Sequence, residues 1–582
     1  MKKLLAAAFA VLIITGFLAG CATTSAKIVA TRPIRACIGA EPESIDPAIN
    51  QTTDGATYIS HAFEGLMKTD KSGKTVPGIA ESYQVSADGL TYTFHLRKDA
   101  KWSDGKAVTA HDFVYSLQRV ANPATASAYA YQLYYIKNAS QINSQYVGSD
   151  GKPGKVKIGS DGSPVRNSQG NCQPDSGGKY VSAKSDGSPV WLDDLGVKAT
   201  DSHTLVITLT SPCTYFLQIA ASPTLYPVRQ DIVEKNPDKW TLSPDTYISD
   251  GPYIMKSWNH NSKIVFVKNP YYYDKKDIVS NEIDWMLMSD SNAVLAAYKS
   301  GKLDLAEDYP TDELAGLVKS GDAKINSLLA VYYYVFNCSK APFNNPKVRQ
   351  ALTLAVDRSY LVKTVDKGGQ TPAGAFVPFG VPDAADQTDF RKTGGSYLPT
   401  TTNKETLAKA KRLLAEAGYP NGKGFPITEI KFVTNEGNQK IAEFIQSEWK
   451  NNLGITVTLS NEEGSVYLSD KAAGNYGIAC NGFSGDYNDP MTFLDLYTSQ
   501  SGNNDAGYSN TEYDRLIEQA KVTSNQKQRM ATLHKAEKIL MSDLPVMPIY
   551  YYTDPDLISP NLQGEVHSIF GYKYLMWASV KQ

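Results

Sequence analysis

The spacing of apolar and polar residues predicts both helices and strands along most of the chain, without a short repeat. Asn345 can cap a helix that has Pro346 in its first turn and an apolar face from Val348 onward. A second helix is expected over residues 404–417, because Gly418 follows the end of its apolar stripe. These signals indicate a mixed α/β protein.

A β-α-β unit is predicted directly after this second helix. An apolar strand at residues 427–433 precedes a helical stripe, and an alternating strand starts at Ile455 after Gly454. The stripe consists of Ile441, Phe444, Ile445 and Trp449. Near the end of the chain, residues 530–541 are expected to form a helix and residues 544–552 a strand.

The N-terminus has the pattern of an export signal. Lys2 and Lys3 precede an apolar run over residues 4–17, which is shorter than the ~20 residues that a membrane-spanning helix needs. The run leads into Leu-Ala-Gly and Cys21, which is typical of a lipoprotein signal. We therefore expect removal of residues 1–20 and lipidation of Cys21. An ordinary secretory signal with a chance cysteine, or a short N-terminal anchor, is the alternative.

Length and charge narrow the class of protein. Loss of residues 1–20 leaves 562 of the 582 residues and removes Lys2 and Lys3, so the formal charge changes from −2 to −4. This balance argues against a nucleic-acid binder and against a polyacid. Because single cores stop growing at about 250–300 residues, two or three lobes are expected, with room for a ligand between them.

Tyrosine dominates the aromatic residues, with 36 Tyr against 18 Phe and 7 Trp. Runs at residues 332–334 and 550–552 would suit a wet cleft, since tyrosine combines apolar area with a polar tip. The alternative is that such runs are strands that alternate between core and solvent.

Five cysteines remain besides Cys21, and they are spread too widely for a disulfide framework. They are Cys37, Cys172, Cys213, Cys338 and Cys480. At most one or two disulfides are expected, and Cys172 could pair with Cys213 because the two flank one irregular segment.

That irregular segment covers about residues 148–190 and is rich in Gly, Ser, Asp and Pro. Asp-Gly is first of all a turn dipeptide, so surface hairpins or a loose insertion are expected. A calcium site is the alternative, but no stretch matches the spaced acidic loop of an EF-hand, so we expect no metal.

Enzyme motifs are mostly missing. The Gly-Lys-Thr at residues 73–75 lacks the glycine that a phosphate-binding loop needs five positions earlier, where Lys68 stands. The Lys-Thr-Gly at residues 392–394 resembles one element of penicillin-recognising serine hydrolases, but their Ser-Asp-Asn element is absent. We expect neither enzymatic activity nor a cofactor.

Several sequence blocks carry a family resemblance when they are taken in order. They are Glu-Pro-Glu-Ser-Ile-Asp-Pro (41–47), Phe-Glu-Gly-Leu (63–66), Trp-Ser-Asp-Gly (102–105), Ala-His-Asp-Phe-Val-Tyr-Ser (110–116), Asp-Gly-Pro-Tyr (250–253), Asn-Pro-Tyr-Tyr (269–272) and Val-Arg-Gln-Ala-Leu (348–352). The ordered set resembles the extracellular solute-binding proteins of family 5, and most closely the oligopeptide-binding lipoproteins of ABC importers. The resemblance covers roughly residues 35–575 apart from the insertion.

The resemblance implies an α/β fold of the periplasmic-binding-protein type (class II, cluster C), a three-lobed hinged trap with mixed sheets. The expected ranges are 21–53, 204–329 and 554–582 for a discontinuous lobe I, 54–203 for lobe II, and 330–553 for lobe III. Lobes I and III would close around the ligand, with hinges at the crossings near residues 329 and 553.

The resemblance also implies peptide-binding residues. Asp486 matches the position that binds the terminal ammonium of a peptide, whereas Asp489 with Pro490 suits the start of a helix. The peptide main chain would be held by strand addition, which does not depend on side chains. The further candidates are Glu41, Glu43, Ala330, Tyr333, Gly482, Phe483 and Ser484, together with Tyr129 from lobe II.

Some positions depart from the better-known family pattern. Lys471 and Cys480 occupy positions where that pattern has arginines. Asn438 replaces a histidine, and Gly464 replaces a tryptophan. Lys471 and Asn438 remain peptide-binding candidates, but the loss of two guanidinium groups leaves capture of the peptide C-terminus in doubt. Glu307 and Asp308 replace a tyrosine and an asparagine, which either favours basic peptides or leaves two solvated carboxylates.

The implied function is a non-enzymatic receptor, lipid-anchored on the outer face of the cytoplasmic membrane, which captures oligopeptides and delivers them to an ABC permease. We expect a monomer that contacts the membrane only through its lipid and binds no nucleic acid. The alternatives keep the fold and change the ligand to a dedicated signal or cell-wall peptide, a nickel chelate or a sugar.

Overall fold

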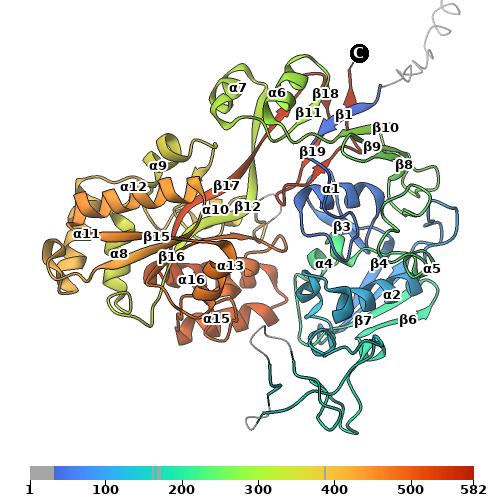
Figure 1. Cartoon of the computed structure of the whole chain (residues 1–582), viewed down its shortest axis with the longest axis horizontal. Helices are drawn as coiled ribbons and strands as arrows, with labels where there is room; N and C mark the ends of the chain where they lie inside the picture. The colour runs from blue at the N-terminus through green and yellow to red at the C-terminus, as the bar shows by residue number, and fades with distance from the viewer. Residues whose placement is uncertain (1–31, 160–162, 167–171, 386–387, 582) are drawn as a thin grey trace, which may run out of the picture.

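Two long antiparallel strands, β12 (Ala323–Phe336) and β17 (Val546–Ile558), join the two halves of the molecule (Figure 1). The computed structural model describes residues 32–159, 163–166, 172–385 and 388–581. Among these residues, β12 and β17 lie in the middle of an 11-stranded mixed sheet. Its order is β15-β14-β16-β12-β17-β11-β1-β10-β9-β8, and β13 pairs with β17 beside it. The predicted signal and Cys21 lie outside the described residues.

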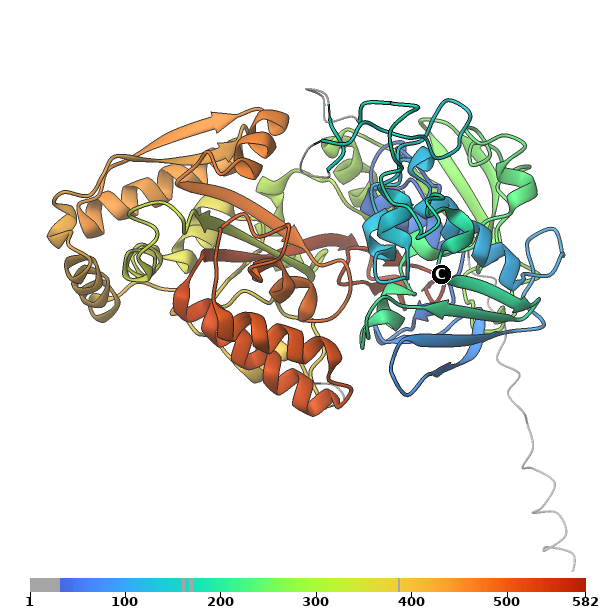
Figure 2. The same ribbon diagram turned by 90° about the horizontal axis from the view of Figure 1, so that it is seen from below.

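One half of the molecule packs helices around one end of this sheet (Figure 2). Its remaining strands are β13 (Thr371–Pro372), β14 (Thr428–Val433), β15 (Val457–Glu462) and β16 (Ile478–Ser484). Its helices are α8 (Pro346–Leu354), α9 (Arg358–Leu361), α10 (Phe390–Gly394), α11 (Lys404–Glu416), α12 (Glu436–Leu453), α13 (Gly464–Ala472), α14 (Met491–Leu494), α15 (Thr511–Val522) and α16 (Gln526–Asp543).

The other half contains the opposite end of the sheet and the C-terminal segment. Its strands are β1 (Ile34–Cys37), β2 (Met67–Thr69), β3 (Thr75–Pro77), β8 (Tyr253–Asn259), β9 (Lys263–Lys268), β10 (Glu282–Met286), β11 (Leu305–Ala306), β18 (Leu562–Gln563), β19 (Val566–His567), β20 (Lys573–Tyr574) and β21 (Ser579–Val580). Its helices are α1 (Thr53–Ala62), α4 (Phe216–Ile219), α5 (Gln230–Val233), α6 (Ser291–Lys299) and α7 (Leu314–Ser320).

A separate antiparallel sheet in this second half has the order β4-β5-β7-β6. Its strands are β4 (Ala80–Val85), β5 (Thr91–Leu96), β6 (Val197–Asp201) and β7 (Thr204–Thr208), and the helices beside it are α2 (Ala110–Ala121) and α3 (Ala139–Asn143). Because β7 pairs with both β5 and β6, a lobe boundary at residue 204 would cut this sheet. We therefore propose that lobe II extends through β7.

The locally signalled helices and the β-α-β unit occur where the sequence predicts them. Asn345 precedes α8, and its side chain accepts a hydrogen bond from the backbone nitrogen of Lys347. α12 ends at Gly454, whose φ of +71° is the left-handed conformation that favours glycine. β14 and β15 then pair in parallel. α16 and β17 are longer than predicted, because β17 continues across the centre of the molecule.

The two tyrosine runs lie inside β12 and β17 rather than along a wet cleft. Five of the six side chains are at most 5% exposed, and the rings of Tyr332 and Tyr550 stack with centroids 5.0 Å apart. The cleft prediction for these runs is therefore wrong. The strand alternative is correct, but both faces of the strands are covered, so the runs do not alternate between core and solvent.

The described part of the insertion consists of short bridged turns, such as those pairing Val147 with Pro153 and Ala183 with Pro189. This agrees with the Asp-Gly turn signals. Cys172 and Cys213 are both unpaired, so the possible disulfide between them does not form. Across the described residues, no helix combines the length and the apolar character needed to cross a bilayer.

Candidate functional site

A cavity of about 490 Å³ lies where the two halves of the molecule meet. It is lined by Pro47, residues 50–53, Ala56, Tyr129, Gln132, residues 222–224, Glu307, residues 328–330, residues 484–486, Asp554 and residues 569–572. Segments far apart in the sequence therefore share one wall, including the irregular middle of β12, the end of β16 and the C-terminal segment. A cavity formed in this way suits a ligand held between moving lobes.

The end of β16 brings Asp486 into this cavity. Ala330 of β12 pairs with Ser484 of β16, and the backbone nitrogen of Gly485 donates to the carbonyl oxygen of Leu329 at 2.7 Å. A Cβ at Gly485 would lie 2.7 Å from Leu329 Cδ2, so this close approach of the two segments excludes a side chain there. Asp486 follows directly and turns its carboxylate toward the other half.

Asp486 lies at the junction of three cavities. Besides the cavity of about 490 Å³, it lines two neighbouring cavities of about 250 and 890 Å³. The hydroxyl of Tyr131 donates to Asp486 Oδ1 at 2.6 Å, and the Tyr131 ring lies 5.7 Å from that of Tyr129. Burial raises the pKa of the Asp486 carboxyl above its ordinary value, and the Tyr131 hydrogen bond partly offsets this effect.

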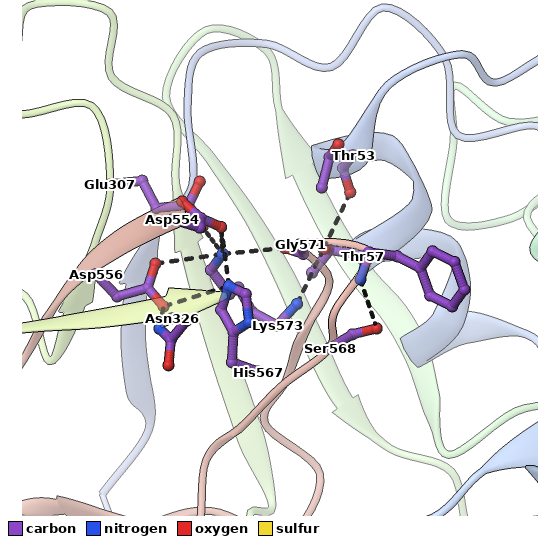
Figure 3. A network of polar contacts seen from close by, with 11 residues as sticks. Thr53, Thr57, Glu307, Asn326, Asp554, Asp556, His567, Ser568, Gly571 and Lys573 are labelled. Carbon is purple, nitrogen blue, oxygen red and sulfur yellow. Dashed lines mark hydrogen bonds and ion pairs between the residues drawn. The ribbon is translucent and has the colours of Figure 1, made fainter. Parts of the chain in front are cut away.

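The opposite part of the cavity wall belongs to an ion cluster of which sequence reasoning identified only Glu307 (Figure 3). The Lys573 ammonium lies 2.5 Å from Asp554 Oδ2, 2.7 Å from Glu307 Oε1 and 3.2 Å from Asp556 Oδ1. His567 Nε2 lies 2.9 Å from Asp554 Oδ2. We call these five residues the Lys573 cluster. No local signal could have found it, because Lys573 is 266 positions from Glu307.

The Lys573 cluster includes a group that could hold a metal ion, since ligand atoms of Asp554, Asp556 and His567 lie within 4.8 Å of one another. The ammonium of Lys573 already contacts both carboxylates of this group. A divalent cation would have to displace that ammonium, so the residues present fit a metal poorly.

Glu41 and Glu43 are not brought to the cavity wall. Glu41 accepts hydrogen bonds from His260 Nδ1 at 2.5 Å and from the backbone nitrogen of Asn261 at 2.7 Å, within its own half. Glu43 is exposed. The same N-terminal stretch reaches the cavity four residues later, at Pro47.

Several candidates from β12, β16 and their surroundings also lie away from the 490 Å³ cavity. Tyr333 is buried and accepts a hydrogen bond from Asn481, and Asn438 accepts one from Tyr332 at 3.0 Å. The Lys471 ammonium pairs with Asp505 at 3.0 Å. Gly482 is exposed in β16, and Phe483 lines the neighbouring 890 Å³ cavity. Ala330, Ser484, Asp486 and Tyr129 are the predicted residues that share the 490 Å³ cavity.

Asp489 has a structural role. Its Oδ1 accepts a hydrogen bond from the backbone nitrogen of Met491 at 2.9 Å, where α14 starts. The sequence did not reveal its second partner, Arg529, whose guanidinium donates to both carboxylate oxygens at 2.6 and 2.7 Å. Both side chains are at most 2% exposed.

Comparison with known proteins adds a family context to this geometry. The model of the bacterial extracellular solute-binding proteins, family 5 (Middle), matches residues 74–505. The oligopeptide-binding protein OppA of Bacillus subtilis (strain 168) is 34% identical over 550 residues, which cover 94% of this chain and 92% of that protein.

Two solved structures relate to the arrangement of the lobes. The unliganded open form of MppA, described as a periplasmic murein tripeptide binding protein, is 32% identical and covers 95% of this chain and 98% of its own, with a TM-score of 0.78. Haemophilus influenzae OppA in complex with RPPGFSPFR is also 32% identical. The match covers 95% of this chain and 99% of that one, with a TM-score of 0.67. The predicted fold class is confirmed, and the TM-score is higher against the unliganded open form.

Proposed function

This chain belongs to the bacterial extracellular solute-binding proteins of family 5, and we propose that it captures oligopeptides between its two halves. The observation that carries the proposal is the position of Asp486, which lines three adjoining cavities next to the ends of paired strands. Peptides of any sequence share a terminal ammonium and main-chain amides. A half-buried carboxylate beside the ends of strands is suited to recognise both.

The proposed role of Asp486 follows from its electrostatics. Among the described residues, Tyr131 is the one hydrogen-bond donor to its carboxylate, and burial disfavours its charged form. A peptide ammonium beside Asp486 would stabilise that charged form, and the ammonium would gain the partner that a partly buried cation requires. The main chain of the peptide would then run beside Ala330 and Ser484.

Delivery and anchoring are further parts of the proposal. The Leu-Ala-Gly sequence directly before Cys21 supports lipidation of that cysteine, and a diacylglycerol group would tether the protein outside the cytoplasmic membrane. Closure around a peptide would create the surface that an ABC permease recognises. The protein would act by binding alone, without catalysis.

Native mass spectrometry of the mature protein, purified without denaturation, tests the ligand class first. A ladder of co-purified masses that resolves into short peptides is the expected result. A single defined mass would favour a dedicated signal or cell-wall peptide. A protein that carries a nickel chelate or a sugar, or that stays empty and ignores added peptides, would contradict the proposal.

A further inference from the structure

The charged side chains of the 490 Å³ cavity all have the same sign. Among the described residues that line it, Glu307, Asp486 and Asp554 are carboxylates, and no lysine, arginine or histidine is present. A cationic ligand in this cavity therefore meets carboxyl groups, and no fixed cation, among the described lining residues. Asp486 is assigned above to the terminal ammonium of the peptide. The presence of Glu307 and Asp554 in the cavity wall has no role in that assignment.

The Lys573 cluster contains fewer cationic groups than carboxyl groups. Its single ammonium is shared by Glu307, Asp554 and Asp556. Burial lowers the pKa of His567, so its imidazole is neutral at pH 7. The nearby Lys324 pairs with Glu565, at 3.8 Å. Three carboxyl groups thus share one buried cation, and two of them, Glu307 and Asp554, line the cavity.

Two carboxylate oxygens of the cluster remain available to a ligand. Glu307 contacts Lys573 through Oε1, and Asp554 contacts both Lys573 and His567 through Oδ2. Neither Glu307 Oε2 nor Asp554 Oδ1 has a hydrogen-bond partner among the described residues. Both residues line the cavity, so a ligand in it lies next to these two carboxyl groups, which Figure 3 shows beside Lys573.

The shortage of cationic groups affects the protonation of Glu307 when the cavity holds no cation. Burial raises the pKa of Glu307 to about 8, with a further contribution from Asp554 and Asp556, although Lys573 acts in the opposite direction. Glu307 is therefore largely protonated at pH 7 in the empty cavity. A second cation would favour its ionised form.

Strand register sets the distance between the two acidic regions. Gly485 lies beside Leu329 on one side of β12, and Asp554 pairs with Asn326 on its other side. With strands about 4.8 Å apart and a rise of about 3.3 Å per residue, the backbones at Asp486 and Asp554 are on the order of 10 Å apart. An extended peptide whose ammonium contacts Asp486 reaches the Lys573 cluster within its first three residues.

We propose that Glu307, supported by Asp554, selects peptides that carry a lysine or arginine side chain at one of their first three positions. This inference rests on the proposed peptide-binding function and adds the class of peptide. The side-chain cation would contact Glu307 Oε2 and Asp554 Oδ1, while the terminal ammonium contacts Asp486.

The test compares pentaalanine peptides in which lysine, or its neutral isostere norleucine, occupies each position in turn. Titration calorimetry with the mature protein should give about tenfold tighter binding of lysine than of norleucine at one of positions one to three. Positions four and five should discriminate less. In Glu307→Gln that preference should disappear. The amide resembles the protonated acid, so the melting temperature should change little.

Glu462→Gln is the matched control, because Glu462 also accepts a lysine ammonium at 2.7 Å, is 16% exposed and lines none of the three cavities. This variant should keep the lysine preference. In the unchanged protein, the lysine-to-norleucine affinity ratio should rise from pH 6 to pH 8 as Glu307 ionises, then level off. Asp486 and the peptide amino group titrate in the same way with lysine and norleucine peptides, so their contributions cancel in this affinity ratio.

The outcomes separate this inference from the proposed function. Equal binding of lysine and norleucine peptides at every position would overturn the cationic preference and leave peptide binding intact. The same holds if Glu307→Gln, with an unchanged melting temperature, retains the full preference. Failure of every pentapeptide to bind would instead contradict the proposed function.

Discussion

At the scale of single residues, the charge of Asp486 and its hydrogen bond can be separated. Asp486→Asn keeps an oxygen for the Tyr131 hydroxyl but removes the negative charge. We expect peptides with a free amino terminus to bind roughly 30-fold more weakly or worse, since truncating one member of a desolvated charge pair costs about 2–5 kcal/mol. Calorimetric titration with free and N-acetylated forms of one peptide measures this loss.

The acetylated peptide should bind the unchanged protein weakly and should lose little further affinity in Asp486→Asn. Asp284→Asn serves as a control, because Asp284 is a half-buried carboxylate with a lysine partner, Lys263, at 3.1 Å, away from the cavity. If Asp486→Asn binds free and acetylated peptides as the unchanged protein does, Asp486 has no role in ammonium binding.

The residues of the candidate site differ in how far the sequence could reveal them. Asp486 was predicted because it lies in a short recognisable block, and Ala330 and Ser484 were predicted from the family resemblance. The pairing of β12 with β16 then places Ala330 opposite Ser484. Glu41 matched the same pattern but is held by His260, a contact across 219 positions. The Lys573 cluster depends on contacts of this long-range kind, which local patterns do not encode.

At the scale of elements, one buried ion pair ties the segment after β16 to α16. Asp489 caps the start of α14 and accepts hydrogen bonds from the two terminal guanidinium nitrogens of Arg529. Asp489→Asn would leave a buried guanidinium without its counter-charge, and removing one member of such a pair destabilises by about 3–5 kcal/mol. Calorimetric melting should therefore show a marked drop in melting temperature, whereas Asp486→Asn should melt almost normally.

A double variant tests whether the effect belongs to the pair. Arg529→Met in the Asp489→Asn background removes the orphaned charge, so it should recover part of the lost stability. Arg529→Met alone is the second single variant. If the loss of stability in the double variant equals the sum of the losses in the two single variants, Asp489 and Arg529 are not a coupled pair.

Elements with strong local signals were predictable, and those defined by distant partners were not. The caps of α8 and α12 and the alternation in β14 and β15 depend on neighbouring residues only. The extent of β17 depends on its long ladder with β12, over 200 positions away, and the sequence showed only the apolar half of it.

At the scale of the whole molecule, an irregular stretch of β12 coincides with the candidate ligand site. Its ladder with β17 is regular from Ala323 to Ser327 and resumes at Val331, so residues 328–330 form an irregularity between the two halves. The same residues line the 490 Å³ cavity. A strand that is irregular at this point can bend there, and a ligand that contacts it can shift the equilibrium between open and closed forms.

We therefore expect peptide binding to reduce the radius of gyration measured by small-angle X-ray scattering. The decrease should saturate with the calorimetric binding curve, because closure and occupancy are linked. Asp486→Asn should reach the same compact state only at higher peptide concentration, since the variant weakens binding without altering β12. A radius that stays constant at saturating peptide would mean that the two halves do not close, and that the irregularity in β12 is a fixed bend rather than a hinge.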